Sequence, residues 1–112
     1  MDLQYQGVQG MDKDKASIIA RKYIEFIRKR DPNVKKAFIF GSHVKGTCGE
    51  DSDIDLALVF KKLNNTFDMQ VQLMKLRRKF DTRIEPHAFR ESDFNISNPF
   101  ANEILKTGLE IT

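Results

Sequence analysis

The sequence predicts a small α/β (α+β) domain in which helices pack on a small mixed β-sheet. Apolar runs rich in Ile, Val and Phe at 34–40 and 54–60 have the length of buried strands. Segments at 14–30 and 67–80 instead repeat apolar residues at helical spacing. Because helical and strand patterns are interleaved along the chain, we expect one sheet covered by helices.

The chain has 112 residues, the size of one domain with one modest core. Residues 1–12 show neither the helical nor the strand spacing of apolar residues. We therefore expect a flexible N-terminal tail there and a single domain over 13–112. No apolar run is long enough to cross a bilayer, and we expect no signal peptide. A single cysteine, Cys48, cannot form an internal disulfide, which favours a reducing, cytoplasmic location.

The charge balance is mildly basic, with 19 Lys and Arg against 16 Asp and Glu and a net charge of +3. The basic residues gather at 35–36, 61–62 and 75–79. We interpret these clusters as solvated ends of helices and strands, the alternative being a surface that meets RNA or an acidic partner. No dedicated nucleic-acid module is recognisable, because the aromatic residues are not arranged as a stacking platform.

The N-terminal half predicts one helix and two strands. A helix over 14–30 can be capped by Asp12 or Asp14 and is stopped by the Asp-Pro pair at 31–32. Its expected buried stripe is formed by Ile19, Tyr23, Phe26 and Ile27. The strand over 34–40 follows and ends at a glycine, and the strand over 54–60 comes after a polar segment.

The C-terminal half predicts two further helices and a third strand. Apolar residues in the helix over 67–80 follow one another by four, three and four positions: Met69, Leu73, Leu76 and Phe80. A third strand is expected over 82–89, where Pro86 has no N–H to donate and therefore indicates an exposed edge. Asn98 and Pro99 predict the start of a helix that ends at Gly108, and a short last strand can follow at 109–112.

The segment from 41 to 56, GSHVKGTCGEDSDIDL, carries the candidate chemistry. Gly41 lets the chain turn sharply and approach a ligand closely. Ser42 offers a hydroxyl and a backbone N–H to a phosphate, and Lys45 can offset phosphate charge. Gly46 keeps the next turn free of side-chain bulk. A Gly-Ser pair alone is weak evidence, because such pairs also occur in ordinary turns.

Two aspartates follow at the start of the second strand. Asp53 and Asp55 are two residues apart and therefore point to the same face of a strand. Two adjacent carboxylates repel each other unless water or a cation intervenes, and oxygen ligands suit a hard cation such as Mg²⁺. The alternative interpretation is a solvated strand start in which the aspartates are turn residues.

This segment resembles the signature of the DNA-polymerase-β-type nucleotidyltransferase superfamily, and more narrowly its minimal nucleotidyltransferase (MNT) domains. The resemblance covers about 13–112 and rests on seven matched positions: Gly41, Ser42, Gly46, Ser52, Asp53, Asp55 and Leu56. It implies the nucleotidyltransferase fold and transfer of a nucleoside monophosphate from a triphosphate, with ATP expected, to an acceptor hydroxyl. It implies that two Mg²⁺ ions are held by Asp53, Asp55 and a third carboxylate. It also implies a nucleotide-binding set of Gly41, Ser42, Lys45, Gly46 and Ser52.

Glu85 is the candidate for the third carboxylate, where members of this family often have Asp. On strand geometry it shares a face with Arg83 and His87, so His87 could support it. Asp81 is the alternative, although its place between a helix and a strand is typical of a turn residue. His43 follows the Gly-Ser pair, where the family often has Arg. We interpret it as a solvated loop residue, the alternative being a hydrogen bond to the triphosphate.

The resemblance also implies a partner, since minimal nucleotidyltransferases are commonly paired with a helical HEPN toxin in toxin–antitoxin systems. In such pairs the MNT antitoxin transfers AMP to the toxin and silences it. Two alternatives stay open: a non-catalytic antitoxin that acts by binding, and a subunit of a small-molecule or RNA nucleotidyltransferase. A homodimer with acceptor pockets between its subunits would favour the second alternative.

Overall fold

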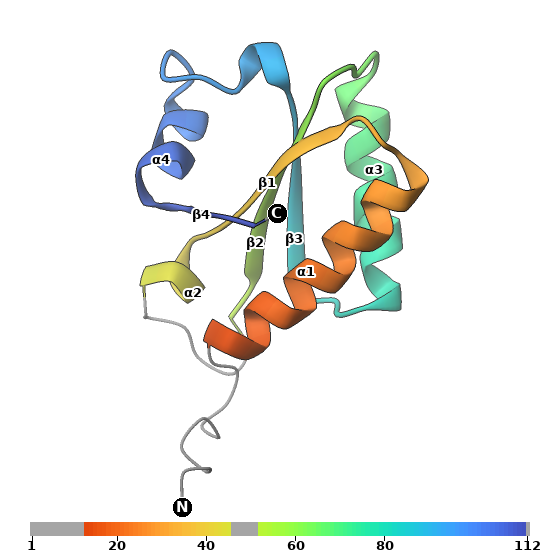
Figure 1. Ribbon diagram of the computed structural model, residues 1–112, viewed down its shortest axis with the longest axis vertical. Helices are drawn as coiled ribbons and strands as arrows, with labels where there is room; N and C mark the ends of the chain where they lie inside the picture. The colour runs from red at the N-terminus through yellow and green to blue at the C-terminus, as the bar shows by residue number, and fades with distance from the viewer. Residues whose placement is uncertain (1–12, 46–51, 112) are drawn as a thin grey trace, which may run out of the picture.

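The computed structural model describes residues 13–45 and 52–111 (Figure 1). The tail expected at 1–12 lies outside these residues. The helices are α1 (Lys13–Arg30), α2 (Ser42–Lys45), α3 (Thr66–Leu76) and α4 (Pro99–Thr107). The strands are β1 (Val34–Phe40), β2 (Ile54–Phe60), β3 (Ile84–Arg90) and β4 (Leu109–Glu110). None of the helices described here has the length and apolarity that a membrane span requires.

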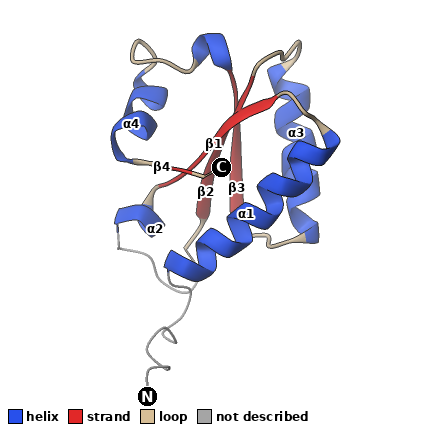
Figure 2. Ribbon diagram, in the orientation of Figure 1, coloured by secondary structure: helices blue, strands red, loops and turns tan. Residues whose placement is uncertain are grey.

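The four strands form one mixed sheet in the order β3-β2-β1-β4. β1 is antiparallel to β2 and to β4, whereas β2 and β3 are parallel. A parallel pair needs a crossover connection, and α3 provides it. The sheet is covered on both faces, by α1 and α3 on one side and by α4 on the other (Figure 2). The fold class predicted from the sequence is therefore confirmed.

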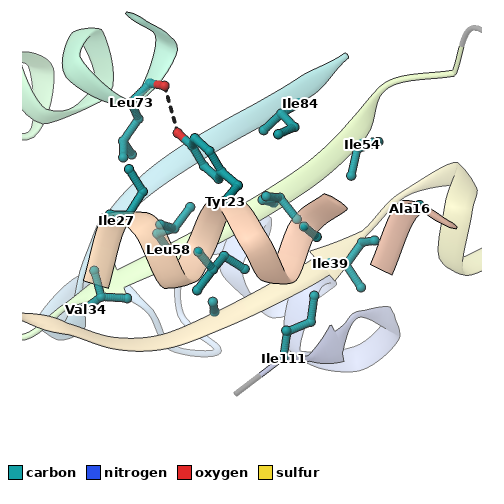
Figure 3. Packing of buried hydrophobic residues seen from close by; sticks show 14 of the residues in the cluster. Ala16, Tyr23, Ile27, Val34, Ile39, Ile54, Leu58, Leu73, Ile84 and Ile111 are labelled. Atoms are coloured by element: carbon teal, nitrogen blue, oxygen red, sulfur yellow. Dashed lines mark hydrogen bonds between the residues drawn. The ribbon is translucent and has the colours of Figure 1, made fainter. Parts of the chain in front are cut away.

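The larger core lies between the sheet and the helices α1 and α3 (Figure 3). From β2 it takes every second residue, since alternate side chains of a strand point to opposite faces: Ile54, Leu56, Leu58 and Phe60. The smaller core lies on the α4 face and takes the intervening positions, including Ala57 and Val59. Because β2 is apolar toward both faces, its whole length is fixed in the middle of the domain.

Tyr23 of α1 ties the two helices of the larger core together. Its side chain is fully buried, and its hydroxyl donates a hydrogen bond of 2.7 Å to the carbonyl oxygen of Leu73 in α3 (Figure 3). Burial disfavours the charged phenolate and so raises the pKa of Tyr23 well above its ordinary value. Tyr23 is therefore neutral at neutral pH, and its hydroxyl is available as the donor.

Replacing Tyr23 by phenylalanine should lower the free energy of unfolding by about 1 kcal/mol, the net value of one buried hydrogen bond. The loss stays small because the Leu73 carbonyl also accepts the backbone N–H of Arg77 and is not left unpaired. Urea unfolding followed by circular dichroism measures the change. A variant as stable as the wild type would show that this bond contributes nothing to the packing of α1 on α3.

Two helical segments differ from the sequence predictions. The residues after Gly41 form a short helix, α2, where the sequence predicts only a turn. The helix expected to reach residue 80 ends at Leu76 and continues as a 3₁₀ turn over Arg77–Lys79. Leu76 and Phe80 still pack against the larger core from these positions. The predicted apolar spacing was therefore correct although the helix is shorter.

The edge position predicted for β3 is confirmed, but the expected exposure is wrong. Pro86 is fully buried. The side chain of Gln70 in α3 donates to the Pro86 carbonyl at 2.5 Å and accepts the Ala88 N–H at 2.9 Å. This carboxamide takes the place of a neighbouring strand, which protects the edge from pairing with another chain. The Pro86 carbonyl and the Ala88 N–H are thus already paired within the domain.

Candidate functional site

The pairing of the strands sets Asp55 beside Glu85. Asp55 of β2 lies opposite Phe40 of β1 on one side and opposite Glu85 of β3 on the other. Paired residues of neighbouring strands project to the same face, so all three side chains point to the α4 side of the sheet. Asp53 is exposed just before β2 begins, with Ser52 half-buried before it. The first two predicted catalytic residues and the predicted third carboxylate therefore lie at the same end of the sheet.

Gly41 places the turn after β1 directly against the Asp55 carboxylate. Its φ is +83°, in the left-handed region that favours glycine. A Cβ added at Gly41 would collide with Oδ2 of Asp55 and would lie 3.2 Å from its Cγ. The backbone of the turn is thus pressed onto this carboxyl group, and α2 begins at the next residue, Ser42. The glycine that the sequence predicts for close approach is needed because of Asp55 itself.

Parts of the predicted nucleotide-binding set lie outside the described residues. Gly46 belongs to the segment 46–51, which the structure does not describe. The backbone of Lys45 ends α2, but its side chain is outside the description, as is that of His43. The contribution of Lys45 and Gly46 therefore stays a prediction.

Glu85 forms an ion pair that the sequence analysis missed. Its Oε2 lies 3.1 Å from Nη1 of Arg77, and the same Nη1 donates to the carbonyl oxygen of Ile84 at 2.9 Å. We interpreted the basic run at 75–79 as solvated, and for Arg77 this was wrong, since its side chain is only 22% exposed. Its position was one hint, since Arg77 follows α3 directly and lies eight residues before Glu85, on the connection that leads into its strand.

Aromatic rings lie beside Asp55 and Glu85 on the α4 face of the sheet. The ring centroid of His87 lies 5.7 Å from that of Phe40 and 5.3 Å from that of Phe100 in α4. His87 does share a face with Glu85, as predicted, but the structure packs its ring between two phenylalanines. This packing gives His87 a place in an aromatic wall beside the carboxylates.

Asp81, the alternative third carboxylate, serves the turn before β3. Its Oδ1 accepts the backbone N–H and the Nε–H of Arg83, both at 2.9 Å, and its Oδ2 accepts from Nη2 at 2.6 Å. These hydrogen bonds from Arg83 lower the pKa of Asp81. An aspartate held in this way stabilises the helix-to-strand turn, which agrees with its interpretation as a turn residue.

The donors at this end of the sheet fit a hard divalent cation. Carboxylate oxygens are the ligands that Mg²⁺ prefers, and the turn at Gly41 brings backbone close to one of them, Asp55. Within 13–45 and 52–111, however, no three residues of ligand type already form a cluster that could hold a metal. Asp53, Asp55 and Glu85 therefore stay predicted ligands, and the carboxylate of Glu85 is paired with Arg77 in this structure.

Comparisons with known proteins agree with this fold. The family model described as polymerase beta nucleotidyltransferase matches residues 21–112. No curated protein matches the chain. Among solved structures, a candidate nucleotidyltransferase of Sulfolobus solfataricus is 22% identical, with a TM-score of 0.64 over 92% of this chain and 88% of that one.

Two other similar structures are toxin–antitoxin complexes. A mutant form of the pair MntA–HpeT matches at 19% identity and a TM-score of 0.60, over 83% of this chain and 71% of that one. A toxin–antitoxin with AMP-PNP matches at 17% identity and a TM-score of 0.59, over 80% and 70%. Identities this low show a shared fold, whereas the family model spans most of the sequence. The chain belongs to the polymerase-β-type nucleotidyltransferase family.

Proposed function

We propose that this domain is a Mg²⁺-dependent nucleotidyltransferase that moves a nucleoside monophosphate, from ATP, onto an acceptor hydroxyl. The observation that carries the proposal is the close approach of the Gly41 turn to the Asp55 carboxylate. A turn with exposed amides suits phosphate, and a carboxylate beside it suits the cation that accompanies phosphate. Membership of the nucleotidyltransferase family supports the same reaction class.

The place of each predicted site residue at this end of the sheet suggests its role in the proposed reaction. Asp53 and Asp55 would hold two Mg²⁺ ions, which when bound neutralise the triphosphate and acidify the acceptor hydroxyl. Gly41, Ser42 and Lys45, with Gly46 and Ser52, would hold the β- and γ-phosphates. Glu85 would accept the proton of the acceptor hydroxyl, directly or through water. The acceptor oxygen then bonds to the α-phosphorus, the bond from that phosphorus to the bridging oxygen breaks, and pyrophosphate leaves.

The acceptor that we propose is a partner toxin of the HEPN type, which makes this chain an AMP-transferring antitoxin. Two similar folds come from toxin–antitoxin complexes, one of them with AMP-PNP. The residues that the structure describes form one small layered domain around a four-stranded sheet. A partner protein would bring its own hydroxyl to the end of the sheet where Asp53, Asp55 and Glu85 lie.

One observation favours the alternative of an antitoxin that acts by binding alone. Glu85 is paired with Arg77, and no three carboxylates are assembled among the residues that the structure describes. In that case the toxin would be neutralised without label transfer. The two functions differ in one measurable respect, which is the covalent transfer of nucleotide.

The test uses ATP labelled at the α-phosphate, Mg²⁺ and the protein encoded by the neighbouring gene. The wild type should label that protein, and Asp53→Asn/Asp55→Asn should lower the rate by about 100-fold or more, since it removes the groups that hold the catalytic ions. The matched control is Asp68→Asn/Glu103→Gln. It removes two exposed carboxylates that are not part of the proposed site, and it should keep the wild-type rate. Undiminished labelling by the first double variant would refute the proposal, and tight binding without labelling would support the alternative.

A further inference from the structure

Arg77 reaches from one face of the sheet to the other around the outer strand. It follows α3, which packs on the larger core, and Ile84 of β3 is buried in that same core. Glu85, the next residue, points to the opposite face. By bonding both the Ile84 carbonyl and the Glu85 carboxylate, Arg77 holds Glu85 at the outer edge of β3.

The ion pair between Arg77 and Glu85 is a weak one of its kind. A single nitrogen, Nη1, serves both acceptors, so the pair lacks the two parallel bonds that make arginine–carboxylate pairs strong. The Nε of Arg77 is buried and has no hydrogen-bond acceptor among the described residues. The Glu85 side chain is 35% exposed, which leaves it room to change its direction.

Glu85 has Arg77 on its outer side and Asp55 on its inner side, where β2 runs in register with β3. Two carboxylates repel each other when no cation lies between them, which favours the outer position. A divalent ion on Asp55 would reverse this preference, because a cation attracts a second carboxylate. A cation held by Asp55 would therefore compete with Arg77 for the Glu85 carboxylate.

We propose that Arg77 is a positioning residue that competes with the divalent cation for Glu85 and thereby sets the affinity of the site for metal. The proposal rests on the proposed function, in that Asp53 and Asp55 are taken as the metal ligands. It adds that Glu85 completes the shell by exchanging Arg77 for the cation.

The experiment measures binding of Mn²⁺ alone by electron paramagnetic resonance in the wild type, Arg77→Met, Glu85→Gln and the double variant. Arg77→Met should bind Mn²⁺ about fivefold more tightly than the wild type, while the same change on the Glu85→Gln background should alter the affinity by less than about twofold. An equal gain on both backgrounds would show a general effect of charge and would overturn the proposal. Unchanged or weaker binding by Arg77→Met would overturn it as well.

Asp53→Asn/Asp55→Asn separates this inference from the proposed function. If Mn²⁺ binds through these aspartates but shows no coupling between Arg77 and Glu85, only the inference fails. If the wild type does not bind Mn²⁺, or binds it as well without the aspartates, both fail.

A second measurement uses the wild type and does not depend on the folding of Arg77→Met. The side-chain NH resonances of Arg77 are followed by NMR while Mg²⁺ is added. They should shift as Glu85 leaves, and they should stay in place in Glu85→Gln and in Asp53→Asn/Asp55→Asn. Resonances that stay in place in the wild type at saturating Mg²⁺ would overturn the exchange.

Discussion

Replacing Gly41 by alanine should weaken binding of a Mg²⁺–nucleotide complex by about tenfold or more, the scale of losing one or two well-placed contacts. The added Cβ would collide with the Asp55 carboxylate, so either the carboxylate or the turn has to move. Both belong to the proposed site, so a shift of either one should disturb it. Isothermal titration with Mg²⁺ and a non-hydrolysable ATP analogue measures the affinity.

The same substitution should also lower the free energy of unfolding by about 1–2 kcal/mol, because an L side chain is strained at the φ of +83° that Gly41 adopts. Gly41→Asn separates the two causes. Asparagine tolerates the left-handed region but still carries a Cβ, so it should recover part of the stability and none of the affinity. Wild-type affinity in both variants would show that the turn is not part of the site.

Local sequence pattern was sufficient for the strands at the centre of the sheet. The ranges predicted for the first two strands, 34–40 and 54–60, are those of β1 and β2. Both are interior strands, and most of their residues are buried, as the apolar runs at 37–40 and 56–60 indicate. The helix start at Asn98 was also predictable, because capping is a local interaction. The Asn98 side chain accepts the N–H groups of Phe100 and Ala101 and so fixes the start of α4.

What the sequence could not supply are the contacts made across the fold. The register that places Asp55 beside Glu85 depends on the parallel pairing of β2 and β3, which no local pattern encodes. Arg77 resembles its exposed basic neighbours in sequence, and only the packing of α3 on the edge of β3 brings it to Glu85. The cover of Pro86 by Gln70 has the same origin. Elements were therefore predictable, while the partners of charged and edge groups were not.

Replacing Leu58 by alanine should lower the free energy of unfolding by about 3 kcal/mol, from the lost burial and the cavity that remains. Leu58 is fully buried in the larger core, on an interior strand that cannot easily close around a void. Because domains of this size are stable by only about 5–15 kcal/mol, the variant should have a markedly lower urea midpoint. Leu105→Ala in α4 is the matched control, since Leu105 is 40% exposed and should cost less than about 1 kcal/mol.

The Leu58 variant also tests whether the core and the site are separate. Leu58 and Asp55 lie on the same strand but point to opposite faces, Leu58 toward α1 and α3 and Asp55 toward the α4 side. A cavity on one face should leave the other in place, so the folded fraction should bind Mn²⁺ with the wild-type affinity. A loss of affinity in parallel with stability would instead mean that packing behind β2 sets the position of Asp55. A cost no larger than that of Leu105→Ala would contradict the central place of β2 in the core.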